Sequence, residues 1–168
     1  METASKGGSI LYKAIIAVLI VVLIISLYIP RQIWNQETME EQECHDRLYA
    51  LLLAETYYKQ KTNTYSTSFD TLLAVLKTDP QTMAEMDTTY TNYLFSDQDS
   101  VGAIQNIPLD SAGVCPTTGL PYSIAISDSI PALILSCPNE EGEASVYGIF
   151  KKKIHNHGNI KDDNLSWK

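Results

Sequence analysis

An uncharged apolar run occupies residues 14–29, and Ile10 and Leu11 extend it toward the N-terminus with Lys13 as the one charge in between. As an α-helix rising ~1.5 Å per residue, residues 10–29 cover a hydrocarbon core of roughly 30 Å. Lys13 lies near the start of this run, where its stem follows the lipid while its ammonium group reaches the headgroups. The sequence therefore predicts a transmembrane helix over residues 10–29.

A cleaved secretory signal is the alternative interpretation, because Lys6 precedes the apolar stretch. Such signals have an apolar core of roughly 7–15 residues that ends at a small-x-small cleavage site. Here the run is longer, and it leads into Tyr28-Ile29-Pro30-Arg31, which offers no pair of small residues to cut between. A membrane anchor is the favoured interpretation.

The charges on the two sides of the run predict its orientation. Lys6 and Lys13 precede or begin the span, whereas Arg31 alone follows it before the acidic stretch 37–43. Positive charge stays on the cytoplasmic side of a membrane, so we expect residues 30–168 to lie outside the cytoplasm. That part of the chain carries 10 basic and 19 acidic residues. Such an acidic domain argues against a nucleic-acid partner, whose recognition needs a basic surface.

Residues 31–61 predict a long helix that continues from the membrane span without a linker. They are rich in Gln, Glu, Leu, Ala and Met, and they contain no Gly or Pro. Apolar side chains recur at three-, four- and seven-residue steps, as one buried helix face requires: Trp34, Cys44, Leu48, Leu51, Leu52 and Tyr58. The helix should end near residues 61–63, and a second, short helix should run through Leu72 to Leu76. Residues 81–87 are ambiguous.

From Thr88 onward the pattern changes to short apolar or Tyr/Thr-rich pieces separated by turn residues, which is typical of strands. The predicted strands are 89–95, 102–107, 122–126, 132–136 and 144–149. The tail that follows is polar and weakly patterned. The predicted fold is α+β: an N-terminal transmembrane helix continues into a long amphipathic helix packed on a small antiparallel β-sheet. The predicted parts are a short basic N-terminus (1–9), the span (10–29) and one extracytoplasmic domain (30–168).

Three cysteines, Cys44, Cys115 and Cys137, fall on the side where disulfides are permitted. Cys115 and Cys137 stand in similar Cys-Pro contexts on the two sides of a predicted hairpin. A disulfide between them would contribute roughly 3 kcal/mol by restricting the unfolded chain, and it would leave Cys44 over. Three unpaired thiols are the alternative.

Metal-binding and catalytic sites are not predicted. Cys44-His45 and His155-Asn156-His157 supply the right residue types for zinc, but neither Cys115 nor Cys137 has a second Cys or His two to four residues away. Histidines in a Lys-rich tail are more often surface residues, and no local signature supports a Cys/His nucleophile pair. We therefore expect no enzyme activity, no cofactor and no small-molecule substrate.

Several segments together resemble the type IV pilin and type II secretion pseudopilin superfamily. The basic, Gly-ending segment Lys6-Gly7-Gly8-Ser9 before the apolar run is similar to its leader. The aromatic end of the long helix, the Cys-Pro-Thr-Thr-Gly-Leu-Pro-Tyr segment at 115–122, and the His-Gly and Ser-Trp pairs near the C-terminus are similar to its globular domain. The residues that carry this likeness are Tyr57, Tyr58, Tyr65, Leu72, Pro116, Gly119, Tyr122, His157, Gly158 and Trp167.

The resemblance implies a subunit of a pilus-like or secretion machine in the bacterial inner membrane, with its N-terminus in the cytoplasm and its domain in the periplasm. The implied partners are the lipid bilayer and other pilin-like subunits or their assembly platform. Leader processing would fall between Gly8 and Ser9. Lateral packing would use one face of the span: Lys13, Ile16, Leu19, Leu23 and Leu27.

One position departs from the family pattern. After cleavage at Gly8, Lys13 would occupy the fifth position, where the family normally has Glu paired with a neighbour's amino terminus. A membrane-tethered binding or sensory domain that does not enter a filament is therefore the alternative function.

Overall fold

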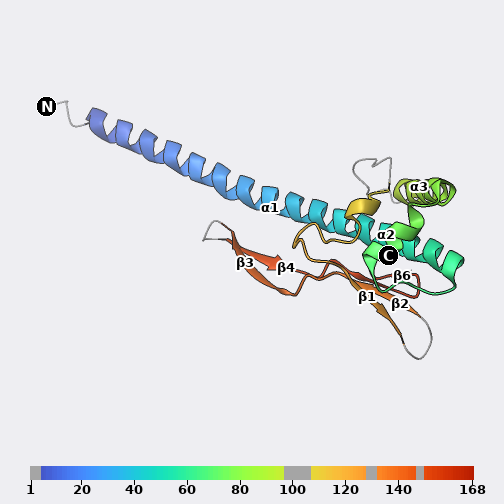
Figure 1. Ribbon diagram of the computed structural model, residues 1–168. Coiled ribbons are helices and arrows are strands. Elements are labelled where there is room, and N and C mark those ends of the chain that lie inside the picture. Colours follow the sequence, from blue (N-terminus) through green and yellow to red (C-terminus); the bar gives the residue numbers. More distant parts are fainter. Residues whose placement is uncertain (1–4, 97–106, 128–131, 147–149) are drawn as a thin grey trace. The chain divides into compact units, whose positions relative to one another are not determined.

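The computed structural model describes residues 5–96, 107–127, 132–146 and 150–168. Its first helix, α1 (Ser5–Thr62), is 58 residues long and includes Pro30 (Figure 1). The helix ends as predicted, because Asn63 adopts the left-handed conformation (φ 60°) and donates its N–H to the carbonyl of Lys59 at 2.8 Å. The chain divides into two units, Met1–Met39 and Glu40–Lys168.

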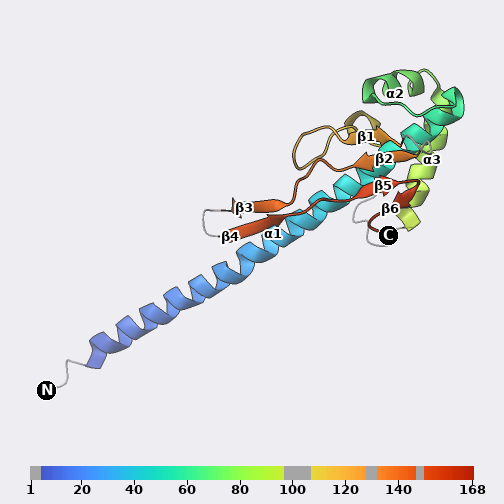
Figure 2. The same cartoon turned by 90° about the horizontal axis from the view of Figure 1, so that it is seen from below.

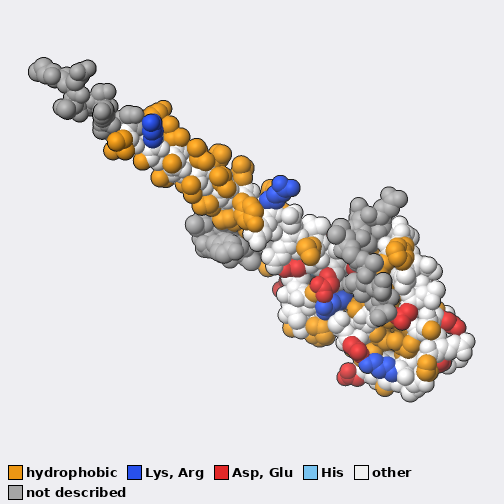
Figure 3. Space-filling model, turned by 90° about the horizontal axis from the view of Figure 1, so that it is seen from above, with side chains coloured by type: hydrophobic (Ala, Val, Ile, Leu, Met, Phe, Trp, Pro, Cys, Tyr) orange, Lys and Arg blue, Asp and Glu red, His pale blue; other side chains and the backbone are white. Residues whose placement is uncertain are grey.

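The first unit presents the apolar run as an exposed helix. The part of α1 from Ile10 onward is long and apolar enough to cross a membrane, and none of its most apolar window is buried. On the face seen in Figure 3, apolar side chains cover most of this part of the helix. The predicted span is thus confirmed as an apolar helix of sufficient length. Trp34 was expected on the buried face but is 68% exposed, so that face begins only farther along the helix.

Two further helices belong to the second unit, α2 (Phe69–Leu76) and α3 (Pro80–Ser96). The short helix α2 was predicted. The strand predicted at 89–95 is wrong, since these residues continue α3. Met86, Tyr90, Tyr93 and Leu94 recur at helical spacing and are all buried, and this packing outweighs the strand preference of Thr and Tyr.

Within the described residues, the strands form two small antiparallel sheets. The first has the order β1-β2-β5-β6, and the second pairs β3 with β4 (Figure 2). Their bounds are β1 (Ser123–Ile126), β2 (Leu133–Ser136), β3 (Gly142–Val146), β4 (Phe150–Ile154), β5 (Asn159–Lys161) and β6 (Asn164–Leu165), with a 3-10 turn, η1 (Leu109–Ser111), before β1. The predictions for β1 and β2 are confirmed.

The remaining strand predictions have mixed outcomes. The predicted strand 144–149 overlaps the end of β3 and then leaves the described residues at 147–149. The strand predicted at 102–107 falls almost wholly on 97–106, outside the described residues. Strands β4, β5 and β6 lie in the tail that the sequence pattern left unassigned.

Buried side chains of the second unit form two clusters on α1. One cluster joins α1 to α2 and α3, around Leu72, Leu76, Met86 and Tyr90. The other joins α1 to the first sheet and contains all three cysteines together with Leu48, Leu51, Leu133, Leu135 and Ile160. The fold is therefore α+β, as predicted, and the packing of α1 on the sheet positions the cysteines.

Candidate thiol site

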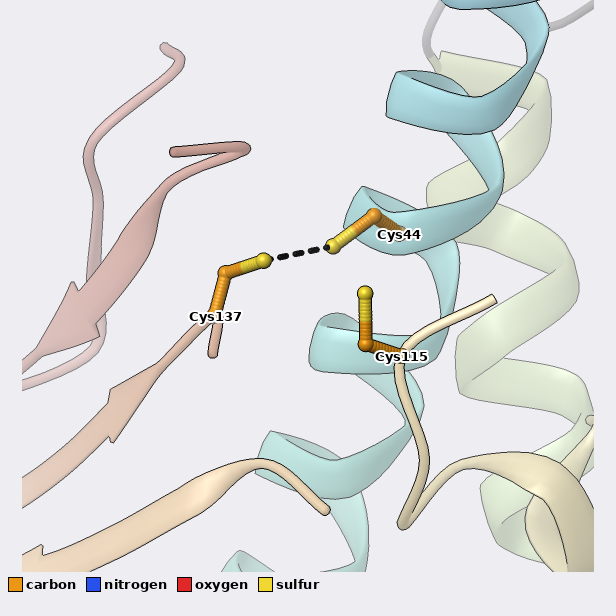
Figure 4. A group of neighbouring side chains, drawn as sticks. All are labelled: Cys44, Cys115 and Cys137. Carbon is orange, nitrogen blue, oxygen red and sulfur yellow. Dashed lines mark hydrogen bonds between the residues drawn. The ribbon is translucent and has the colours of Figure 1, made fainter. Parts of the chain in front are cut away.

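Three distant segments bring the cysteines together. Cys44 lies on α1, Cys115 lies in the loop before β1, and Cys137 directly follows β2. Their three Sγ atoms all lie within 4.8 Å of one another, and the exposed fractions of the three residues are 0%, 0% and 5%. In Figure 4 the three side chains point toward a common centre from the helix, the loop and the strand end. All three are present as thiols.

A tight loop places Cys115 in this cluster. The N–H of Gly119 donates to the carbonyl of Cys115 at 2.9 Å, and the N–H of Cys115 donates to the carbonyl of Leu120 at 2.9 Å. Gly119 has a φ of 68°, a left-handed conformation that glycine adopts without a steric cost. The loop closes where the N–H of Tyr122 donates to the carbonyl of Gly113 at 3.0 Å. The segment 115–122 noted in the sequence is therefore a loop that holds one thiol in place.

Each sulfur has polar neighbours. The thiol of Cys44 donates to Sγ of Cys137 at 3.6 Å, and the thiol of Cys115 lies 3.8 Å from the side-chain oxygen of Asn139. The hydroxyl of Tyr122 donates to Sγ of Cys44 at 3.2 Å and lies 3.4 Å from that residue's carbonyl oxygen. The Tyr122 hydroxyl therefore ties the loop to α1.

These contacts give the thiols of Cys44 and Cys137 different acidities. Hydrogen bonding from the Cys44 thiol lowers the pKa of Cys137 below its usual range, and the backbone N–H groups of Asn139 and His157 act in the same direction, against the effect of burial. Donation to Cys137, together with burial, raises the pKa of Cys44. When the cluster carries one negative charge, that charge is therefore on Cys137, because its sulfur is the common acceptor.

Side chains of the C-terminal tail pack with Asn139 and with His45 of α1. Asn139 is buried, and its amide nitrogen lies 3.3 Å and 3.4 Å from the two ring nitrogens of His157, which is 6% exposed. His45 stacks on Trp167, with ring centroids 4.2 Å apart. A Cβ on Gly158 would lie 2.7 Å from the ring of Trp167, so the His-Gly and Ser-Trp pairs pack directly on each other. His155 is exposed as expected, whereas the surface position expected for His157 is wrong.

The other residues of the predicted sites lie on α1, on the two buried clusters and in the loop that carries Cys115. Gly8 and Ser9 fall within the helical backbone of α1, and Lys13, Ile16, Leu19, Leu23 and Leu27 are exposed along its apolar part. Tyr57 and Tyr58 are half-buried against the cluster of α1, α2 and α3, which includes Leu72, and Tyr65 packs against the cluster that joins α1 to the first sheet. Pro116 and Gly119 shape the loop at 115–122. The residues of the family-like motifs therefore serve the packing of the second unit.

The predicted disulfide between Cys115 and Cys137 stays a prediction, since the two residues are neighbours but are present as thiols. The disulfide predicted from the sequence gave Cys44 no partner, but the sulfur of Cys44 lies 3.6 Å from that of Cys137. Cysteine spacing speaks against a metal site only where the ligands are close together in the sequence. It missed a cluster whose members are 71 and 22 residues apart along the chain. Only the shared helical face of Cys44, Leu48 and Leu51 gave a signal that Cys44 is buried.

Compared with protein-family models, curated protein sequences and solved structures, the chain has no match. The resemblance to pilins and pseudopilins therefore rests on the sequence motifs and on the α+β arrangement of the elements.

Proposed function

We propose that this chain is a non-enzymatic, membrane-anchored subunit of a type II secretion or type IV pilus-like envelope machine. One observation carries the proposal: a single unbroken helix, α1, has an exposed apolar first part and a buried second part on which the sheet packs. An exposed apolar helix of this length requires lipid or other apolar helices around it. The second part of the same helix contributes buried residues to both core clusters of the folded domain.

The charge distribution supports an orientation with the domain outside the cytoplasm. Lys13 is exposed at the start of the apolar part. The charged residues that follow the apolar part are predominantly acidic. By the positive-inside rule the N-terminus lies in the cytoplasm and the second unit lies outside it. In the bacterial inner membrane that the resemblance implies, that side is the periplasm. The partners in this proposal are lipid and the apolar helices of other pilin-like subunits, which pack through Ile16, Leu19, Leu23 and Leu27.

The exposed ammonium group of Lys13 favours a second candidate, a tethered binding or sensory domain outside any filament. An unpaired ammonium in an apolar helix bundle costs several kcal/mol, so Lys13 opposes lateral packing unless a neighbour supplies a carboxylate. The two candidates differ in whether the helix contacts other helices or lipid alone.

Mass measurement and N-terminal sequencing of the chain from native membranes, combined with a photocrosslinker at Leu23, distinguish the two candidates. The subunit proposal predicts a chain that begins at Ser9 and crosslinks to helices of pilin-like proteins. A Lys13→Glu variant, which restores the family's charge, should crosslink at least as well. A chain that keeps residues 1–8 and crosslinks only to lipid would overturn the subunit proposal and favour the tethered domain.

A further inference from the structure

The spacing of the three sulfurs matches a thiolate metal site. A zinc–sulfur bond is about 2.3 Å long, so two sulfurs of a tetrahedral site lie about 3.8 Å apart. Sγ of Cys44 and Sγ of Cys137 are 3.6 Å apart, and Sγ of Cys115 lies within 4.8 Å of both. A shift of less than about 1 Å in one side chain would place the three sulfurs on a common ion, without a change in the backbone.

The number of sulfurs also favours a metal ion. A disulfide between any two of the cysteines leaves the third thiol buried beside it, whereas a metal ion uses all three. The backbone N–H groups of Asn139 and His157 both favour the thiolate form of Cys137. N–H donors stabilise a thiolate, and a sulfur in a disulfide is a much weaker acceptor.

The geometry points to a site for one soft divalent metal ion of the zinc class, held by the thiolates of Cys44, Cys115 and Cys137. Binding leaves all three sulfurs as thiolates and releases to solvent the protons that they still carry, so the metal with its sulfurs has one net negative charge. The N–H groups that face Cys137 and the hydroxyl of Tyr122 at Cys44 stabilise this charge.

A neutral fourth ligand is available close by. The side-chain oxygen of Asn139 lies 3.8 Å from Sγ of Cys115, and the amide of Asn139 contacts the ring of His157. Both side chains are buried. With an oxygen or an imidazole nitrogen in the fourth position the site is closed, which is characteristic of structural rather than catalytic zinc. The metal would fasten α1 to the 115–122 loop and to the end of β2.

Cobalt(II) uptake by the full-length chain in detergent tests the site. After reduction and removal of metal by a chelator, the chain should take up one equivalent of Co²⁺ with intense thiolate-to-cobalt absorption, and one equivalent of Zn²⁺ should displace it. X-ray absorption of the zinc form should show three sulfurs at about 2.3 Å. Both measurements use the unmodified chain, so the result does not depend on whether a variant folds.

Variants identify the ligands. Cys44→Ser, Cys115→Ser and Cys137→Ser should each abolish the full absorption, whereas Tyr122→Phe, a change beside the sulfurs that removes no ligand, should keep one equivalent of bound metal. The proposal is overturned by a reduced chain that binds no cobalt through sulfur, or by fewer than three sulfurs on zinc. It is also overturned by a chain that is isolated without reductant and contains a disulfide among these residues.

Discussion

The carboxyl group of Glu55 is fully buried on α1. Its Oε2 accepts a hydrogen bond from the backbone N–H of Ser66 at 2.9 Å, while Oε1 has no hydrogen-bond partner among the described residues. Burial disfavours the ionised form and raises the pKa of Glu55 from 4.5 to about 7, although the Ser66 bond acts in the opposite direction. Glu55 is therefore neutral in the folded chain below about pH 7.

Replacement of Glu55 by Gln should remove a pH dependence of stability. Between pH 4.5 and 7 the unfolded chain ionises Glu55 and the folded chain does not, so the wild-type free energy of unfolding falls as the pH rises. At pH 7 this fall in the wild-type free energy of unfolding, measured relative to Glu55→Gln, should reach about 3 kcal/mol, since one pKa unit corresponds to about 1.4 kcal/mol. Urea unfolding of both proteins at pH 4, 5.5 and 7.5 measures this difference.

Glu141→Gln provides the matched control for this experiment, because Glu141 is exposed. Its pH profile should follow the wild type. Parallel profiles of wild type and Glu55→Gln would contradict a neutral buried Glu55.

Among the elements, α3 depends on a cap that the sequence analysis did not identify. Oδ1 of Asp79 accepts the N–H groups of Gln81 and Thr82 at 3.0 Å and 3.2 Å, and Pro80 occupies the first turn, where its missing N–H costs nothing. The ammonium of Lys61 at the end of α1 binds Oδ2, and it holds the pKa of Asp79 below its usual range. The cap therefore also joins the end of α1 to the start of α3.

Asp79→Ala should lower the free energy of unfolding by about 1 kcal/mol, because two N–H groups of the first turn lose their acceptor. Asp79→Asn keeps an acceptor oxygen for both N–H groups. It loses the exposed ion pair, which is worth little, and the Oδ2 acceptor of the Thr82 hydroxyl, which can instead accept from the new amide, so its unfolding free energy should fall by less than half as much. Thermal or urea unfolding followed by circular dichroism compares the two. Equal losses would mean that the ion pair, and not the cap, stabilises this junction.

The helices and strands that could be predicted from the sequence are those with strong local patterns. Helix α1 has its apolar run and its later buried face, and β1 and β2 have short apolar runs between turns. The second half of α3 was mistaken for a strand because Thr89, Tyr90 and Tyr93 prefer strands locally, and only tertiary contacts decide otherwise. β4 to β6 are short and rich in Lys and Asn, so they carry no apolar alternation. The thiol cluster depends on how these elements pack, and cysteine spacing cannot reveal that.

For the whole molecule, membrane anchoring by α1 depends on a balance of transfer free energies. Residues 14–29 contain twelve Ile, Leu and Val residues. Near the centre of a span each of these favours insertion by about 0.3–0.6 kcal/mol, and each Arg opposes it by about 2.5–3.5 kcal/mol. One Arg leaves the balance in favour of insertion, whereas two near the centre reverse it.

Leu19→Arg combined with Leu23→Arg should therefore release the chain from the membrane fraction, while Leu19→Arg alone should leave most of it there. The matched control places the same two charges at Gln36 and Thr38, beyond the apolar run, and should remain membrane-bound. Alkaline carbonate extraction of membranes, followed by detection of the chain in pellet and supernatant, measures the outcome. If the double variant stayed in the pellet while the protein was folded, the apolar part of α1 would not be what attaches this chain to the membrane.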